Sequence, residues 1–146
     1  MTLNKPSRCE IWPVPFTDAQ EVDFEALDQL TDFYAQSGVD GLFLLALSGE
    51  GLEQTEQQCS AVCKHVLRRN EGRMRLVTGG NFRGELPEQI RQINKIAETR
   101  PDAVVVMLST LPHRDRLVED LLEIARQTAD VPLVLYECTD PAHRLL

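Results

Sequence analysis

The sequence contains no long apolar run and no signal for export. Its longest continuous apolar stretch runs from Ala103 to Leu108, whereas a membrane-spanning helix needs about 20 apolar residues. The first residues, Met1 to Pro6, lack the apolar stretch that a secretory signal carries. We therefore expect a cytoplasmic protein with no membrane partner.

Basic charge is also scarce. Lys and Arg number 15 against 23 Asp and Glu, which gives a formal net charge of −8. Nucleic-acid binding depends on clustered cations that neutralise phosphates, so we expect no nucleic-acid partner. The densest basic segment, Arg68 to Arg75, contains Glu71 and is expected to span a helix end. Cations there favour the helix dipole, and we interpret them in that way.

The four cysteines do not predict a metal site. Cys59 and Cys63 are four residues apart, which places them on one face of a helix, but His65 falls on another face. The sequence has no second Cys or His pair at a spacing that would complete a zinc site. We therefore predict no metal and interpret the two thiols as small buried apolar groups.

What the sequence does contain is a regular alternation of short apolar runs and amphipathic segments. Asp23 and Gly38 are suited to begin and end the first helix, and Thr55 begins the second with a Thr-x-x-Gln capping box. The fourth run is apolar at every position, which is typical of a parallel strand covered on both faces. The predicted strands are residues 11–16, 41–46, 74–78, 103–108 and 132–136.

This alternation predicts an α/β fold of four βα units plus a fifth strand, with parallel strands joined by right-handed crossovers. An open doubly wound sheet and part of a closed barrel both fit the pattern. The ~10 residues after the fifth strand are too few for a further crossover, and Asp40 and Asp102, two βα units apart, precede similar strands. We therefore predict a partial (β/α)8 TIM barrel, with residues 1–146 forming the N-terminal part of one barrel domain, truncated before strand 6.

Three segments resemble the dihydrodipicolinate synthase / N-acetylneuraminate lyase family. Pro13 to Thr17 is similar to the family's Thr-Pro-Phe segment at the first strand. Ser37 to Glu50 resembles its Gly-Val-Asp-Gly-Leu strand, which ends in Gly-Thr-Thr-Gly-Glu. Val131 to Tyr136 is similar to its fifth strand, which ends in a tyrosine. The order and spacing of these segments cover nearly the whole chain.

The resemblance implies a lyase of the Schiff-base aldolase or dehydratase type, acting on pyruvate or another 2-oxo acid or sugar acid. A lysine amine forms an iminium that serves as electron sink, so no cofactor is implied. In the family this lysine ends the sixth strand, and none of Lys5, Lys64 and Lys95 matches it. We therefore expect the 146-residue chain alone to be inactive. The resemblance also implies a homo-oligomeric parent protein.

The resemblance assigns four site residues. Tyr136 matches the catalytic tyrosine, which transfers protons. Ser48 and Gly49 match the loop that holds the substrate carboxylate through hydroxyl and backbone N–H donors. Arg144 is a candidate for gripping a distal carboxylate, although its register is offset. We interpret His113 and His143 as solvated loop residues.

The sequence also departs from the family pattern. Leu47 replaces a threonine of the tyrosine's proton relay, and residues 109–112 contain no match to the relay's second tyrosine. These departures motivate an alternative, a non-catalytic relative that binds an oxo acid or sugar acid. A third hypothesis is a small receiver-like or flavodoxin-like domain. It lacks support because the first strand ends without clustered acids or a phosphate loop.

Overall fold

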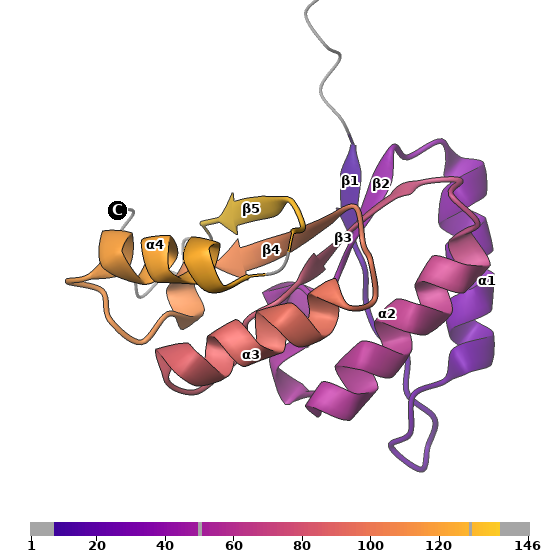
Figure 1. Ribbon diagram of the computed structural model, residues 1–146. Helices are drawn as coiled ribbons and strands as arrows, with labels where there is room; N and C mark the ends of the chain where they lie inside the picture. Colours follow the sequence, from indigo (N-terminus) through magenta and orange to yellow (C-terminus); the bar gives the residue numbers. More distant parts are fainter. Residues whose placement is uncertain (1–7, 50, 129, 138–146) are drawn as a thin grey trace, which may run out of the picture. The chain divides into compact units, whose positions relative to one another are not determined.

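The computed structural model describes residues 8–49, 51–128 and 130–137, in which strands and helices alternate along the chain (Figure 1). The strands form one sheet in the order β1-β2-β3-β4-β5. The strands of this sheet are β1 (Cys9–Ile11), β2 (Gly41–Leu44), β3 (Arg75–Gly79), β4 (Ala103–Met107) and β5 (Leu133–Tyr136). The helices are α1 (Phe24–Ser37), α2 (Glu56–Asn70), α3 (Leu86–Ala97) and α4 (Leu117–Gln127).

The strand order decides between the two architectures that the sequence left open. A doubly wound open sheet reverses its strand order at a switch point, whereas a (β/α)8 barrel adds each new strand beside the previous one. Here each strand neighbours its successor, and the β1–β2 and β4–β5 pairs are parallel. The predicted fold class, part of a TIM barrel, is therefore confirmed.

The chain divides into two compact units, Met1–Val77 and Thr78–Leu146, with the boundary inside β3. In the first unit α1 packs against α2, and all four residues of β2 are buried. In the second unit α3 packs against β4 and α4, and all five residues of β4 are buried. No helix in the described part of the chain is long and apolar enough to cross a membrane.

Local signals set both ends of α1 and the start of α2 as predicted. The Asp23 carboxylate accepts a hydrogen bond from the Ala26 amide at 2.9 Å, and Gly38 ends α1 with a φ of 77°. Thr55 and Gln58 form the reciprocal capping box at the start of α2. Side-chain acceptors satisfy amide groups that the first turn of a helix leaves unpaired, so these short motifs fix the helix starts locally.

The first strand lies earlier than the sequence predicted. β1 covers Cys9–Ile11 and not residues 11–16, although the Trp12 amide still donates to the Phe43 carbonyl at 3.1 Å. Pro13 and Pro15 have no N–H to donate to a neighbouring strand, so the ladder ends before them. Phe16 instead forms an isolated antiparallel bridge with Val22 in the turn that leads to α1.

Helix α4 buries only part of the apolar stripe that its sequence predicts, which comprises Leu117, Val118, Leu121, Leu122 and Ala125. Val118 and Leu122 are 66% and 49% exposed, whereas Leu117 and Leu121 are half-buried. The fully buried residues are Asp120 and Ile124, one turn apart. A buried carboxylate needs a polar partner, and His113 provides it, as described below.

Candidate functional site

Ser48 lies just after β2, in a short 3-10 turn (Leu47–Gly49) at the carboxyl end of the strand. β2 ends at Leu44 because Leu45 adopts a left-handed backbone conformation with a φ of 54°, which turns the chain. Ser48 is exposed and Gly49 is buried. The hydroxyl predicted to hold a substrate carboxylate is thus accessible at the carboxyl end of a parallel strand.

Gly49 has a packing reason to be glycine. A Cβ atom at this position would lie 2.4 Å from the carbonyl oxygen of Trp12, closer than any side chain allows. Its amide donates to the Ala46 carbonyl at 3.0 Å, and the Gly51 amide donates to the same oxygen at 3.2 Å. The Gly49 amide is therefore used inside the turn. The predicted role of Gly49 in substrate binding stays a prediction.

Trp12, which the sequence analysis did not single out, lies beneath this turn. Its side chain is fully buried, and its ring lies 5.6 Å from that of Tyr34, centroid to centroid. Its indole Nε1 is a buried donor without a hydrogen-bond partner. As the single tryptophan of the chain, directly before a Pro-Val-Pro segment, it was available as a signal for a buried strand end.

Tyr136, the predicted catalytic tyrosine, is the last residue of β5 in the second unit. It pairs in register with Met107, the last residue of β4, and is half-buried. The two adjacent parallel strands thus end together, at Met107 and Tyr136. The structure therefore places the tyrosine at the carboxyl edge of its strand pair, as predicted from the sequence.

Asn81 fixes the end of β4 through its side-chain amide. Its Oδ1 accepts from the Met107 amide at 2.7 Å, and its Nδ2 donates to the Met107 carbonyl at 3.0 Å and to Thr110 Oγ1 at 2.7 Å. The Gly80 amide still donates to the Val105 carbonyl at 3.0 Å. The Asn81 side chain thus extends the hydrogen bonding between β3 and β4 after the backbone of β3 has turned away.

Two glutamines of α3 complete this buried network. Gln89 is fully buried. Its Oε1 accepts from Asn81 at 2.9 Å, and its Nε2 donates to the carbonyls of Gly84 and Thr110 at 2.9 and 2.7 Å. Gln92 accepts from the Phe82 amide at 2.9 Å and donates to the Arg83 carbonyl at 3.0 Å. Satisfied buried networks of this kind hold a single arrangement, here of the loop after β3 and the turn after β4.

The sequence analysis missed this network because glutamines in an amphipathic helix are normally read as surface residues. The available signal was Asn81 itself, which follows Gly79 and Gly80 directly after a predicted strand. An amide side chain at such a strand end is suited to bonding both groups of a neighbouring peptide.

His113 lies in a loop and is partly exposed, as the sequence predicted, but its side chain also has a buried partner. Its Nδ1 lies 3.1 Å from Oδ2 of Asp120, and the Asp120 side chain is 2% exposed while that of His113 is 39% exposed. The sequence showed the two residues seven positions apart, across the start of α4. The fold of the loop that joins them, and not the helical spacing, brings them together.

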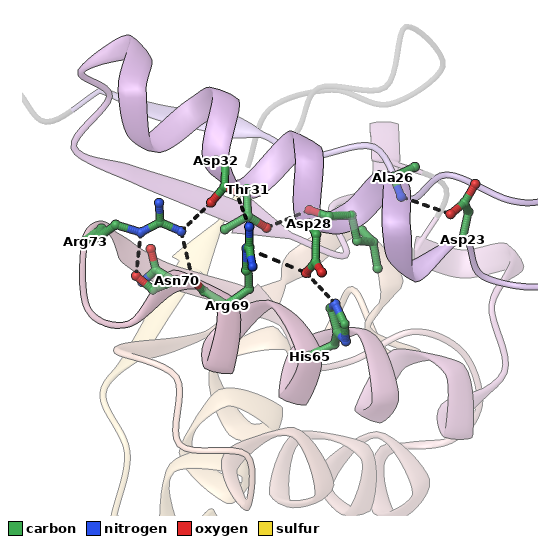
Figure 2. Close-up of polar contacts among 10 residues, drawn as sticks. Asp23, Ala26, Asp28, Thr31, Asp32, His65, Arg69, Asn70 and Arg73 are labelled. Atoms are coloured by element: carbon green, nitrogen blue, oxygen red, sulfur yellow. Dashed lines mark hydrogen bonds and ion pairs between the residues drawn. The ribbon is translucent and has the colours of Figure 1, made fainter.

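The remaining polar cluster lies on the seam between α1 and α2 and joins the two helices (Figure 2). His65 Nε2 lies 2.8 Å from Asp28 Oδ1, Arg69 pairs with Asp32, and Arg73 Nη2 lies 2.8 Å from Asp32 Oδ1. Hydrogen bonds from Arg69 and Arg73 hold the pKa of Asp32 below its usual value. The basic residues at the end of α2 therefore pair with acidic residues of α1, in addition to favouring the helix dipole.

The two cysteines of α2 are buried free thiols, in agreement with their interpretation as small apolar groups. Burial raises the pKa of Cys59 to about 12, so this thiol stays protonated and is a poor metal ligand. In the described part of the chain no three His, Cys, Asp or Glu side chains gather as a metal site would require.

Two predicted features fall outside this geometry. Arg144, like His143 and Cys138, lies outside the described residues. Ser48 belongs to the first compact unit and Tyr136 to the second, so the convergence of their hydroxyl groups on one substrate stays a prediction.

A sheet in which each strand neighbours its successor, with α-helices between the strands, defines a barrel-type α/β protein. Residues 10–140 match the model of the dihydrodipicolinate synthetase family. The chain belongs to this family.

Curated relatives agree with this assignment. The chain is 29% identical over 126 residues to the 4-hydroxy-tetrahydrodipicolinate synthase of Oceanobacillus iheyensis, and the match covers 84% of this chain and 41% of that protein. It is 32% identical over 124 residues to the synthase of Sorangium cellulosum, again covering 84% and 41%. The chain thus spans about two-fifths of the length of these relatives.

Solved structures show the same fold. Dihydrodipicolinate synthase from Aquifex aeolicus superposes with a TM-score of 0.80 at 23% identity and covers 89% of this chain and 44% of that one. N-acetylneuraminate lyase from Proteus mirabilis gives a TM-score of 0.79 at 19% identity, covering 92% and 46%.

Proposed function

We propose that the chain supplies the N-terminal part of a Schiff-base lyase that acts on pyruvate or another 2-oxo acid or sugar acid. The observation that carries the proposal is the family match across residues 10–140. The strand order, with Tyr136 at the carboxyl end of β5, is consistent with it. The proposed chemistry uses a lysine imine as electron sink and therefore no organic cofactor or metal.

In this proposal Ser48 and Tyr136 act on the substrate from two strand ends. The exposed Ser48 hydroxyl donates a hydrogen bond to the substrate carboxylate, and the Tyr136 phenol carries a proton during carbon–carbon bond chemistry. Arg144 is proposed to bind a second carboxylate. The lysine is proposed to follow Leu146 in the whole protein, because neither Lys64 nor Lys95, both on helices, matches the family position. The whole protein is proposed to be a cytoplasmic homo-oligomer.

A second candidate is a relative that binds an oxo acid or sugar acid without catalysis. It is favoured by the turn after β4, where the family carries a relay tyrosine. The turn carries two hydroxyl residues, Ser109 and Thr110. The Oγ1 of Thr110 accepts from Asn81 at 2.7 Å and donates to the Met107 carbonyl at 2.9 Å. Because these neutral bonds occupy the hydroxyl, Thr110 does not replace the relay tyrosine.

Reductive trapping with pyruvate and borohydride tests the proposal. The 146-residue chain is expected to form no covalent adduct by intact mass, whereas a longer polypeptide that continues past Leu146 is expected to form one on a lysine. An adduct on Lys64 or Lys95 of the short chain would overturn the expected inactivity. Pyruvate binding by the longer polypeptide without trapping would favour the non-catalytic relative. The Tyr136→Phe variant is the control, because it should slow turnover yet leave the lysine in place.

A further inference from the structure

His113 and Asp120 have the geometry of a base and the carboxylate that orients it. The Asp120 side chain is almost completely buried, and its Oδ2 lies 3.1 Å from Nδ1 of His113. The His113 side chain is partly exposed, at 39%. One ring nitrogen is therefore bound to a fixed, buried acceptor while part of the ring reaches solvent.

The fold holds Asp120 in place. It lies in the first turn of α4, and its amide donates to the Arg116 carbonyl at 3.0 Å. Negative charge is favoured at the amino end of a helix. A carboxylate removed from water requires a hydrogen-bond donor, and His113 Nδ1 is placed to be that donor. The Asp120 side chain is thus held in one position by its contact with His113.

This contact selects the tautomer of the imidazole. A carboxylate only accepts hydrogen bonds, so in the neutral ring the proton resides on Nδ1 and the lone pair on Nε2. His65 is the opposite case in the same chain, because its Nε2 contacts Asp28 at 2.8 Å. The two histidines thus present different nitrogens for a further proton.

The pair also lies where the proposed site would be. His113 follows the turn Leu108–Thr110 at the carboxyl end of β4, and Asn81 and Gln89 anchor that turn. Met107, the last residue of β4, is in register with Tyr136. Barrel enzymes build their sites from the loops after the strands. His113 belongs to such a loop, in which the Thr110 hydroxyl is already hydrogen-bonded.

We propose that His113 is a proton-transfer residue of the site and that Asp120 is its positioning residue. A proton leaves a hydroxyl group of the substrate, or a carbon next to its carbonyl or imine, and binds the Nε2 lone pair of His113. The Nδ1 proton remains on the ring, and the buried Asp120 carboxylate stabilises the resulting imidazolium. The reverse transfer restores the neutral ring. This inference rests on the proposed function for its substrate class, a 2-oxo acid.

Nitrogen-15 NMR of the histidine side chains tests the pair itself and needs no activity. In the neutral ring we expect His113 as the Nδ1–H tautomer and His65 as the Nε2–H tautomer in the wild-type chain. The Asp120→Asn variant, which keeps the shape but removes the charge, should lower the Nδ1–H population of His113 and leave His65 unchanged. A predominant Nε2–H tautomer for His113 in the wild-type chain would overturn the proposal.

The exchange of the methyl protons of pyruvate with deuterated water tests the role in a polypeptide that continues past Leu146. His113→Gln should slow exchange on the order of 10²-fold, the usual scale for loss of an acid–base residue. Asp120→Asn should slow it about 10-fold, and both variants should still be trapped by borohydride. His65→Gln is the matched control and should exchange at the wild-type rate.

The outcomes separate the two proposals. Unchanged exchange in His113→Gln, with trapping retained, overturns the role of His113 and leaves the lyase assignment intact. Trapping lost together with exchange in His113→Gln also overturns it, since the residue would then be structural. Absence of trapping in the wild-type polypeptide refutes the proposed function and the substrate class. The pairing of His113 with Asp120 is then tested by the tautomer measurement alone.

Discussion

At the scale of single residues, a close approach between two backbone segments explains why position 49, expected to bind substrate, is a glycine. The family resemblance assigns Gly49 to the loop that holds the substrate carboxylate, and the structure shows a close approach of its backbone to the Trp12 carbonyl. The sequence could mark the position as one that needs glycine. It could not say which group comes close, because Trp12 is far away along the chain and is brought there by folding.

This contact makes a prediction for Gly49→Ala. The added Cβ would lie 2.4 Å from the Trp12 oxygen, and neither backbone can move cheaply, so we expect a loss of about 3 kcal/mol, the upper range for overpacking. Gly38→Ala is the matched control. It has open space around it but a φ of 77°, and should cost about 1 kcal/mol through backbone strain. Urea unfolding monitored by circular dichroism measures both, and equal losses would contradict the argument.

Asn81 and His113 show why some site residues escape sequence reading. Asn81 is hydrogen-bonded to Met107, 26 positions away, and His113 contacts Asp120, 7 positions away. Neither distance matches the spacing of neighbours on one helix or one strand. Tyr136, by contrast, was placed correctly because the last residue of a parallel strand reaches the carboxyl edge whatever the rest of the fold does.

At the scale of elements, the seam between α1 and α2 shows how charge adds to apolar packing. Asp32 on α1 binds both Arg69 and Arg73 of the other helix and its loop, next to the pair of Asp28 and His65 (Figure 2). The groups are partly exposed, so salt should screen the interaction in part. The seam therefore contributes most at low ionic strength.

The depressed pKa of Asp32 predicts an acid-dependent loss of stability. Its folded pKa lies below the ordinary 3.8, so its contribution is fully present above that pH and is lost as the pH falls through the lower folded value. Asp32→Asn should therefore melt below the wild-type chain at pH 6 and match it at the acid end. Calorimetric melting at low salt from pH 6 to pH 2 measures this. The exposed Asp18→Asn variant is the control, and a gap that persists unchanged at pH 2 would refute the assignment.

Element boundaries were predicted where a local motif sets them and missed where a partner does. Asp23 and Thr55 fix helix starts through contacts three residues away, so the sequence suffices. The stripe of α4 was only partly predicted, because Asp120 faces inward together with the apolar Ile124. The pairing with His113 gives this buried carboxylate a polar partner.

At the scale of the whole molecule, β5 is an edge strand with exposed apolar side chains. It pairs with β4 along one side and ends the strand order of the described residues. Val134 and Leu135 are 44% and 56% exposed. Unpaired strand edges with exposed apolar side chains promote association, so we expect the 146-residue chain to self-associate.

Leu135→Lys is predicted to weaken self-association of the 146-residue chain. A charge on the exposed face of β5 opposes strand pairing between copies. Sedimentation velocity over a concentration series should show a wild-type chain that grows in size with concentration and a variant that grows less. Phe33→Lys, at a residue of α1 that is 63% exposed, is the control and should behave as wild type. A wild-type monomer at every concentration would refute the expectation.

The sequence by itself determined the alternation of elements, the helix starts, the parallel character of β4 and the family. All of these depend on neighbours within one or two turns of chain or on motifs in a fixed order. The tertiary structure alone decided the strand order that separates a barrel from an open sheet, the amide network around Asn81, the crowding of Gly49 and the pairing of His113 with Asp120. These depend on which distant groups meet, and the free energy of burying a polar group is decided by the partner that it finds.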